Sequence, residues 1–355
     1  MINMKRISSL LLLVFLLAQL ASAGKNPKNV IFLIGDGMGL GQIYAAMVTN
    51  NNNLELARCK HIGFSKTYCS DRFTTDSGAG GTALATGVKT KYNMIGMNPD
   101  SIPVETILQQ ADKNGLATGI VVSSAITYVT PATFIAHQIH RSMYEEVAAD
   151  FLKTDIDVFI GGGKKHFDSR TDGRNLIDEL KANDYQIALN MDEVKKVKSG
   201  KLAGLIYEDH PPKMPERGDM LPDATMTAIN ILDNNKKGFF LMVEGSQIDW
   251  GGHQNDIDMI INETLDFDKT IGKVLDFAEK DGNTLVIITA DHETGGLTLP
   301  NGNIAKKEVK ASFSTKGHTG VPVPVFAFGP GAEEFMGFME NTDFKNKIAK
   351  LLKLK

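Results

Sequence analysis

The sequence predicts an α/β fold in three layers, in which helices cover both faces of a large, mostly parallel sheet. Continuous apolar runs, which are typical of strands buried on both faces, alternate along the chain with segments whose apolar residues have helical spacing. Strand and helix take turns from end to end, without a repeat, a low-complexity tract or a linker between them. That order indicates a parallel sheet covered on both sides.

The predicted strands are short apolar runs bounded by glycine or polar residues. The first is residues 29–35, NVIFLIG, and the others are residues 62–68, 117–123, 158–160, 238–243, 283–290 and 324–328. Helical spacing is found in residues 104–114, 144–153, 221–232, 257–279 and 345–352. The stretch 190–221 is rich in Lys, Pro and Asp and is interpreted as a surface excursion.

The first 23 residues are predicted to be a signal peptide. Lys5 and Arg6 precede the apolar run of residues 10–18, and Ala21-Ser22-Ala23 supplies the small residues of a cleavage site. The run is too short to cross a bilayer, which needs ~20 apolar residues; a retained anchor is the alternative. We expect export to the periplasm or the medium, and a single domain over residues 24–355.

Composition narrows the class of protein. The chain has 355 residues, 42% hydrophobic and 23% charged, which excludes disorder and a multi-pass membrane protein. A net charge of −4 argues against a nucleic-acid partner and against binding to an anionic membrane. Cys59 and Cys69 form no Cys-x-x-Cys pair, and a disulfide between them requires that the predicted strand 62–68 fold back.

Polar residues with metal-binding side chains follow the predicted strands. Asp36, Glu244, Asp249, Asp291 and His292 all stand at or just beyond strand ends. Ligands of such sheets bind outside the carboxyl ends of the strands. We therefore expect these residues, distant in the sequence, to meet at one edge of the sheet.

Two of the motifs have structural alternatives. Asp36 lies in a glycine-rich turn, but the G-x-G-x-x-G pattern fails at Leu40, so a dinucleotide site is not indicated; a helix N-cap is the alternative. Ser77 precedes a run of small residues that suits a helix whose N-terminus attracts an anion. Its hydroxyl needs activation to act as a nucleophile, and the alternative is an N-cap at Asp76 or Ser77.

Three further motifs carry imidazoles and carboxylates. Asp249 and His253 are four residues apart, a spacing that can place both on one metal ion, and Glu244 offers the oxygen that magnesium prefers. Asp291 and His292 are adjacent after an apolar strand. A lone histidine usually has a structural role, so His318 is a candidate ligand only in combination with these other motifs.

Together the motifs resemble the alkaline phosphatase family. They occur in the family's order through the whole mature chain: GDGMG from Gly35, TDSGAG from Thr75, TPA from Thr130 followed by Arg141, VEGSQIDWGGH from Val243, TADHETGG from Thr289 and GHTG from Gly317. The resemblance implies a metal-dependent phosphomonoester hydrolase with that family's three-layer fold. Phosphomonoesters and inorganic phosphate are then the expected small-molecule partners.

The resemblance also implies a role for each site residue. One zinc ion would be held by Asp249, His253 and His318, and a second by Asp36, Asp291 and His292. A magnesium ion would be held by Asp36, Thr130 and Glu244. Ser77 would be the nucleophile that forms a phosphoserine, and Arg141 would bind phosphate oxygens through its planar fork of N–H donors.

Departures from the family pattern leave some points open. Tyr128 stands where the family often has Asp or His near the magnesium, which affects the identity and affinity of the third metal. Trp250 follows Asp249, whereas the best-studied bacterial form has Lys at this position. A bacterial branch with smaller chains also has Trp here. The interval between His292 and His318 is too short for the insertion that crowns larger dimers, so a homodimer stays open.

Two other functions remain as alternatives. One is a phosphodiesterase or sulfatase of the same superfamily, although the Cys-x-Pro-x-Arg setting of sulfatases is absent. The other is a non-enzymatic periplasmic zinc-binding protein.

Overall fold

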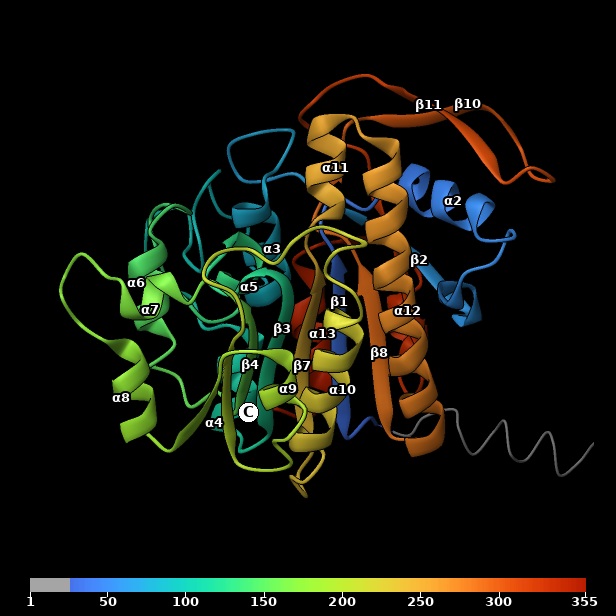
Figure 1. Ribbon diagram of the computed structural model, residues 1–355. Coiled ribbons are helices and arrows are strands. Elements are labelled where there is room, and N and C mark those ends of the chain that lie inside the picture. The colour runs from blue at the N-terminus through green and yellow to red at the C-terminus, as the bar shows by residue number, and fades with distance from the viewer. Residues whose placement is uncertain (1–25) are drawn as a thin grey trace, which may run out of the picture.

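A ten-stranded sheet forms the centre of the molecule (Figure 1). The structure, a computed structural model, describes residues 26–355, and the predicted signal peptide lies outside the described residues. From one edge to the other the strands are β14 (Gly337–Glu340), β2 (His61–Lys66), β13 (Val323–Phe328), β8 (Thr284–Thr289), β1 (Asn29–Gly35), β7 (Phe239–Gly245), β3 (Ala117–Ala125), β4 (Val158–Gly162), β6 (Lys201–Leu205) and β5 (Tyr185–Ala188).

The sheet is mostly parallel, as predicted. Within the ten-stranded sheet of the described residues, β13 alone runs antiparallel to its neighbours, β2 and β8. The central strands end level with one another, because Ile34 of β1 pairs with both Glu244 of β7 and Thr289 of β8, and Val122 of β3 also pairs with Glu244. Residues that follow these strands are thus brought to one edge.

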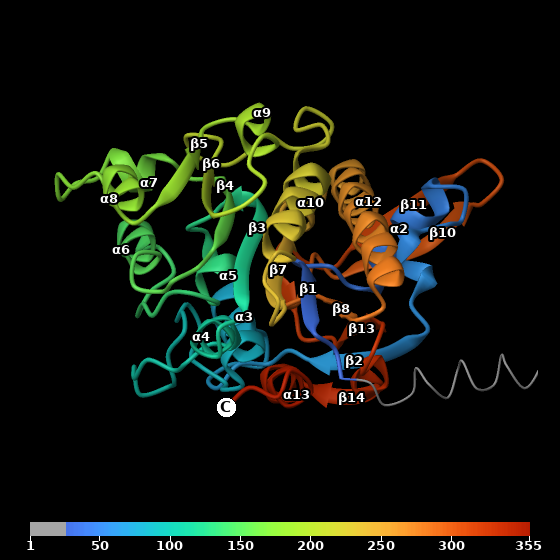
Figure 2. The same ribbon diagram turned by 90° about the horizontal axis from the view of Figure 1, so that it is seen from below.

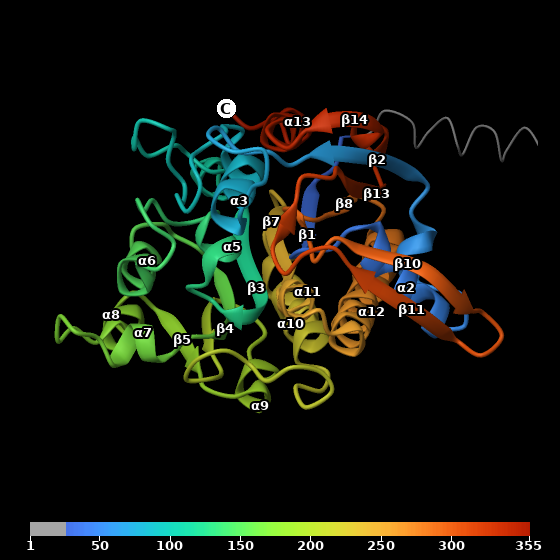
Figure 3. The same ribbon diagram turned by 90° about the horizontal axis from the view of Figure 1, so that it is seen from above.

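Helices cover both faces of the sheet (Figures 2 and 3). On one face α10 (Met220–Leu232) contacts β3, β4 and β7, and α12 (Ile257–Asp281) contacts β1, β7 and β8. On the other face α4 (Ile107–Lys113) and α5 (Val129–Ala132) pack on β7, and α13 (Asp343–Leu351) packs on α3 (Ser77–Thr86) and α4. The remaining helices are α2 (Leu40–Thr49), α6 (Tyr144–Asp150), α7 (Lys165–Asp168), α8 (Leu176–Ala182), α9 (Met191–Val194), α11 (Ile248–Gln254), and the 3-10 turns Glu55–Arg58 and Ala332–Phe335.

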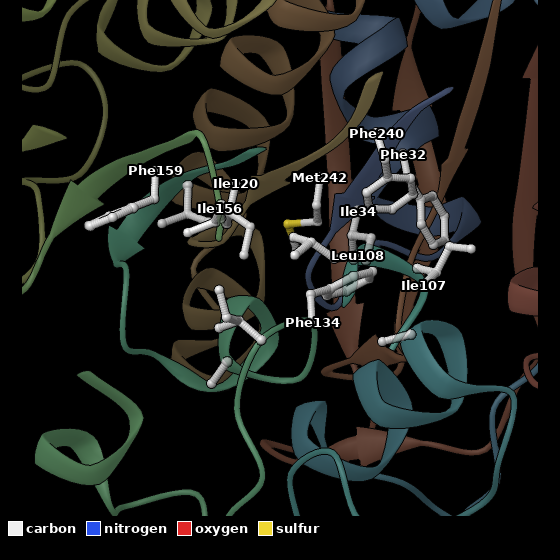
Figure 4. Packing of buried hydrophobic residues seen from close by; sticks show 14 of the residues in the cluster. Phe32, Ile34, Ile107, Leu108, Ile120, Phe134, Ile156, Phe159, Phe240 and Met242 are labelled. Atoms are coloured by element: carbon white, nitrogen blue, oxygen red, sulfur yellow. The ribbon is translucent and has the colours of Figure 1, made fainter. Parts of the chain in front are cut away.

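Alternation along β1 fills two hydrophobic cores, one on each face. Val30, Phe32 and Ile34 belong to the core beneath α4 and α13, whereas Ile31 and Leu33 belong to the core beneath α10 and α12. Phe32 stacks on Phe344 of α13 with ring centroids 5.5 Å apart, and Figure 4 shows its neighbours in the first core. Burial of each such side chain stabilises the fold by about 1.5–3 kcal/mol.

The predicted surface excursion at residues 190–221 is partly wrong. The stretch contains α9 and also β6, whose residues Leu202–Leu205 are buried inside the sheet. Small residues at 203 and 204 break the apolar run, and the flanking lysines conceal the strand in the sequence.

A buried ion pair anchors the loop between β6 and α10. Arg217 donates to Glu263 and Asp266 of α12 over 2.5 and 2.8 Å, and all three side chains are almost fully buried. The same loop reaches the strand ends, because Gln247 donates to the carbonyl oxygen of Pro211 and to that of Ser123.

Two small antiparallel pairs stand at the edge where the parallel strands end. They are β10 (Leu297–Asn303) with β11 (Glu308–Phe313), and β9 (Glu293–Thr294) with β12 (His318–Thr319). Both pairs lie between β8 and β13 in the chain, and the β10–β11 hairpin projects at the top of Figure 1.

The two cysteines are free and buried. The strand β2 lies between them in the chain and advances about 3.3 Å per residue, which separates the thiols. Burial raises the pKa of Cys59 to about 12, and burial also raises the pKa of Cys69.

We expect both thiols of the native protein to react slowly with Ellman's reagent at pH 8, because each is buried and its thiolate is disfavoured. After unfolding in guanidinium without reductant, two thiols per chain should react at once. A denatured, unreduced protein that yields no thiol would show that the cysteines are joined.

Candidate metal centre

Strand ends bring the acidic residues of the site together. Asp36 follows β1, Glu244 lies near the end of β7, and Asp291 and His292 follow β8, the other neighbour of β1. All four residues are buried. The N–H of Asp36 donates to the carbonyl oxygen of Gly245 over 3.1 Å, which continues the β1–β7 ladder past the strand end.

A first group consists of Asp36, Asp291 and His292, whose donor atoms lie within 4.8 Å of one another. Nε2 of His292 is 3.1 Å from Oδ2 of Asp291 and 3.5 Å from Oδ1 of Asp36. The other oxygen of Asp291 accepts hydrogen bonds from the backbone N–H groups of Gly37 and His292. The backbone thereby orients Oδ2 of Asp291 toward the group.

A second group consists of Asp249, His253 and His318. The helix α11 places Asp249 and His253 one turn apart, with Nε2 of His253 3.4 Å from Oδ2 of Asp249. Nε2 of His318, from β12, lies 3.5 Å from Oδ1 of Asp249 and 3.2 Å from Nε2 of His253. The ring of His318 also stacks on that of His292, with centroids 3.6 Å apart, so the two groups adjoin.

The hydrogen bonds of two imidazoles indicate what the second group can hold. Nδ1 of His253 faces the carbonyl oxygen of Lys316 at 2.5 Å, and Nδ1 of His318 faces that of Thr75 at 2.8 Å. A carbonyl oxygen accepts, so each Nδ1 carries the proton when the ring is neutral. With both rings neutral, the two Nε2 lone pairs face each other across 3.2 Å, which is repulsive unless a proton or a metal ion lies between them.

A third set of oxygen donors surrounds Asp36. The hydroxyl of Thr130 donates to Oδ2 of Asp36 over 3.1 Å, and the hydroxyl of Ser246 donates to Oε2 of Glu244 over 2.6 Å. Three buried carboxylate oxygens, Oδ1 of Asp36, Oε1 of Glu244 and Oδ2 of Asp291, have no hydrogen-bond partner among the described residues. Such buried acceptors are costly without a partner, and metal ions would supply one.

The electrostatics of the ion-free site point the same way. Burial, and then the charges of Asp291, Asp249 and Glu244, raise the pKa of Asp36 well above its ordinary value. Burial also raises the pKa of Glu244 to about 8, against the hydrogen bond from Ser246. Burial acts to raise the pKa of Asp249 too, but the His318 hydrogen bond and the neighbouring imidazoles outweigh it and lower that pKa.

Ser77 is the first residue of α3, at the side of the first group. Its Oγ lies 3.2 Å from Nε2 of His292. The N-cap of α3 is Asp76, whose Oδ1 accepts from the N–H of Ala79, so the capping alternative holds for Asp76. Arg141 donates to Oδ2 of Asp76 over 2.8 Å, which places its guanidinium beside the helix N-terminus and Ser77.

The structure thus brings together all ten residues singled out in the sequence, and it adds others. Ser246 and Thr294 hydrogen-bond the site carboxylates; both lie within the quoted motifs, but the sequence assigned them no role. Tyr128 and Trp250 meet edge to face with centroids 5.9 Å apart, and His210 packs on both rings. No pattern in the sequence indicates a role for His210, since only the folded loop brings it to Trp250.

Comparisons with known proteins converge on one family. The family model described as Alkaline phosphatase matches residues 27–312 and 299–354. "Alkaline phosphatase 4" of Bacillus subtilis is 34% identical, with 94% of this chain and 91% of the relative covered. The solved alkaline phosphatase of the Antarctic bacterium TAB5 is 43% identical with a TM-score of 0.89, covering 93% of this chain and 99% of that chain. A variant of the TAB5 enzyme, 41% identical with a TM-score of 0.88 and the same coverage, has Mg bound in its M3 site.

The substitution Asp36→Asn is expected to stabilise the metal-stripped protein at pH 8 by about 1–3 kcal/mol, because it removes a crowded buried charge. A carboxyl whose folded pKa lies above its unfolded value destabilises the fold as pH rises through that range. The gain should therefore shrink toward pH 4. Urea unfolding with a chelator at both pH values measures it, and equal stabilities at pH 8 would contradict the prediction. With zinc and magnesium present, the variant should be the less stable protein.

Proposed function

The chain belongs to the alkaline phosphatase family and is a phosphoric monoester hydrolase, and from that premise we propose that it acts through a phosphoserine on Ser77 in a site for two zinc ions and one magnesium ion. One observation carries the proposal. Carboxylates and imidazoles from four separate parts of the chain gather beside Ser77, whose hydroxyl lies 3.2 Å from Nε2 of His292.

The donor sets fit these metals. Asp249, His253 and His318 offer two imidazole nitrogens and a carboxylate, a set that zinc favours. Asp36, Asp291 and His292 offer a second mixed set. Asp36, Thr130 and Glu244 offer only oxygen, which suits magnesium. In this proposal Asp36 contributes to both the second and the third position, consistent with its two differently placed oxygens.

The chemistry follows from the residues around Ser77. When bound, the zinc ions would lower the pKa of a nearby hydroxyl and neutralise charge on the entering and leaving oxygens. Ser77 attacks phosphorus through Oγ, the ester bond to the leaving alcohol breaks on the opposite side, and the phosphoryl group is carried on Ser77. Water then attacks phosphorus, the bond to Oγ breaks, and inorganic phosphate leaves.

Arg141 and the N-terminus of α3 provide for the other phosphoryl oxygens. The guanidinium pairs with Asp76, one residue before Ser77, and its fork of donors can bind two oxygens at once. The helix N-terminus adds partial positive charge at the same place. These groups are set before substrate arrives, so little reorganisation is needed as charge builds on the phosphoryl group.

Tyr128 distinguishes the third position in this chain. Its ring lies 5.9 Å from the guanidinium carbon of Arg141, and burial raises the pKa of its phenol to about 12. The phenol therefore stays neutral where a carboxylate would add charge. We infer that Asp36, Thr130 and Glu244 hold magnesium without charge from position 128. The TAB5 variant has Mg bound in its M3 site, which supports magnesium as the third ion of this proposal.

The substrate class follows from the reaction. Small phosphomonoesters are the substrates and inorganic phosphate is a product; no nucleic-acid partner is proposed. The predicted signal peptide supports a periplasmic or secreted location for a single catalytic domain, residues 24–355. Within residues 26–355, no helix is both long and apolar enough to cross a membrane. A homodimer is compatible with this function but is not required by it.

The substitution Ser77→Ala should lower the turnover of p-nitrophenyl phosphate at least about a thousandfold, because it removes the attacking oxygen. Elemental analysis should find its zinc content unchanged, since Ser77 is not among the proposed ligands. Acid quenching during turnover should trap a phosphoryl group on the native protein and none on the variant. Ser70→Ala, at an exposed serine seven residues earlier, is the control. Near-normal turnover by Ser77→Ala would exclude the phosphoserine.

The purified enzyme should hydrolyse p-nitrophenyl phosphate faster than bis-p-nitrophenyl phosphate, because the site is built for a terminal phosphoryl group with exposed oxygens. EDTA should abolish the activity, and zinc with magnesium should restore it. Faster turnover of the diester would favour the phosphodiesterase alternative. Zinc binding without release of phosphate from any monoester would favour a binding protein.

A further inference from the structure

Thr294 lies where the two proposed zinc groups adjoin. It is fully buried, and its hydroxyl oxygen is 2.5 Å from Oδ1 of Asp249 and 3.2 Å from Nδ1 of His292. Asp249 belongs to one proposed zinc group and His292 to the other. A single hydroxyl therefore contacts a proposed ligand of each zinc ion. Thr294 belongs to the TADHETGG motif, but the resemblance assigned it no role.

The direction of these hydrogen bonds follows from the chemistry of the partners. A carboxylate only accepts, so the one hydroxyl proton of Thr294 goes to Asp249. The oxygen is then left as an acceptor for His292, which must carry its proton on Nδ1. That tautomer leaves the Nε2 lone pair directed at Asp36, Asp291 and Ser77, the atoms that lie within 3.5 Å of it.

The surroundings fix Thr294 in this place. It pairs with His318 in the short β9–β12 ladder, and its N–H donates to the carbonyl oxygen of Gly37 over 3.2 Å. Glycines at 37 and 252 make room for it: a Cβ at Gly37 would lie 2.7 Å from the Thr294 hydroxyl oxygen, and one at Gly252 would lie 2.8 Å from its methyl carbon. Thr294 thus touches segments that carry ligands of both groups.

We propose that Thr294 is a positioning residue that couples the two zinc positions, by setting the tautomer of His292 and the orientation of Asp249 through one hydroxyl. This inference rests on the proposed function, because it concerns how the same site binds zinc. His253 and His318 differ in this respect, since backbone carbonyl oxygens fix their tautomers. His292 depends on a side chain, which substitution can remove.

The test compares Thr294→Val, which keeps the branched shape, with Thr294→Ser, which keeps the hydroxyl. Zinc affinity of the metal-stripped proteins is measured by competition with a chromophoric chelator at pH 8, independently of activity. We expect Thr294→Val to weaken binding 10–100-fold at both zinc positions. Thr294→Ser should stay within about threefold of the wild type. Circular dichroism checks that each variant folds. If the added methyl group of Thr294→Val prevents folding, Thr294→Ala is used in its place.

Thr319→Val is the matched control. Thr319 is the neighbouring hydroxyl of the same ladder and donates to Glu293, a buried carboxylate outside the proposed ligand sets. Its loss should lower thermal stability but leave zinc affinity within about threefold.

Each outcome decides the matter. Four results would overturn the inference while the proposed function stands. Thr294→Val could bind zinc as tightly as the wild type, or Thr294→Ser could weaken zinc binding as much as Thr294→Val. Zinc affinity could also fall at one position alone, or fall equally in Thr319→Val. A wild-type protein that binds no zinc would overturn both.

Discussion

Buried negative charge is the constraint on which the rest of this molecule depends. Asp36, Glu244, Asp249 and Asp291 are all sequestered from water, and the guanidinium of Arg141 is already paired with Asp76. Burial and the neighbouring carboxylates raise the pKa of Asp36, whereas the hydrogen bond from His318 and the nearby imidazoles outweigh burial and lower the pKa of Asp249. Burial thus makes it costly to ionise these neighbouring carboxylates together, an arrangement suited to binding cations and costly without them.

The rigid sheet holds these carboxylates close together in spite of their mutual repulsion. Asp36, Glu244 and Asp291 extend from adjacent strands whose ends are level, and two hydrophobic cores hold those strands on both faces. Hydrogen bonds from backbone N–H groups then orient Asp291, and backbone carbonyl oxygens orient His253 and His318. The repulsion between the carboxylates is therefore resisted by the rigid part of the protein, and Ser77 lies beside them as the first residue of α3.

Much of this could be predicted from the sequence, because apolar runs report burial directly. The run 29–35 coincides with β1, and the long amphipathic segment 257–279 lies within α12. Residues placed after such runs must share an edge of a parallel sheet, so the meeting of Asp36, Glu244 and Asp291 was foreseeable. The direction of β13 could not be predicted, because its apolar pattern is the same as that of a parallel strand. Lysines beside β6 hide its apolar run. The pairing of Thr294 with His318 involves two residues of each strand and is too short to give a periodic signal.

The reversed direction of β13 has a consequence for how such proteins vary in length. The chain leaves β8 and enters β13 at the same side of the sheet, so the whole segment from Ala290 to Pro322 stays there and never crosses beneath the strands. The outer turn of the β10–β11 hairpin, at residues 304–307, is solvent-exposed. An insertion at that turn leaves the order and direction of the strands unchanged. Additional residues can therefore be accommodated there while Asp291 and His318 keep their positions.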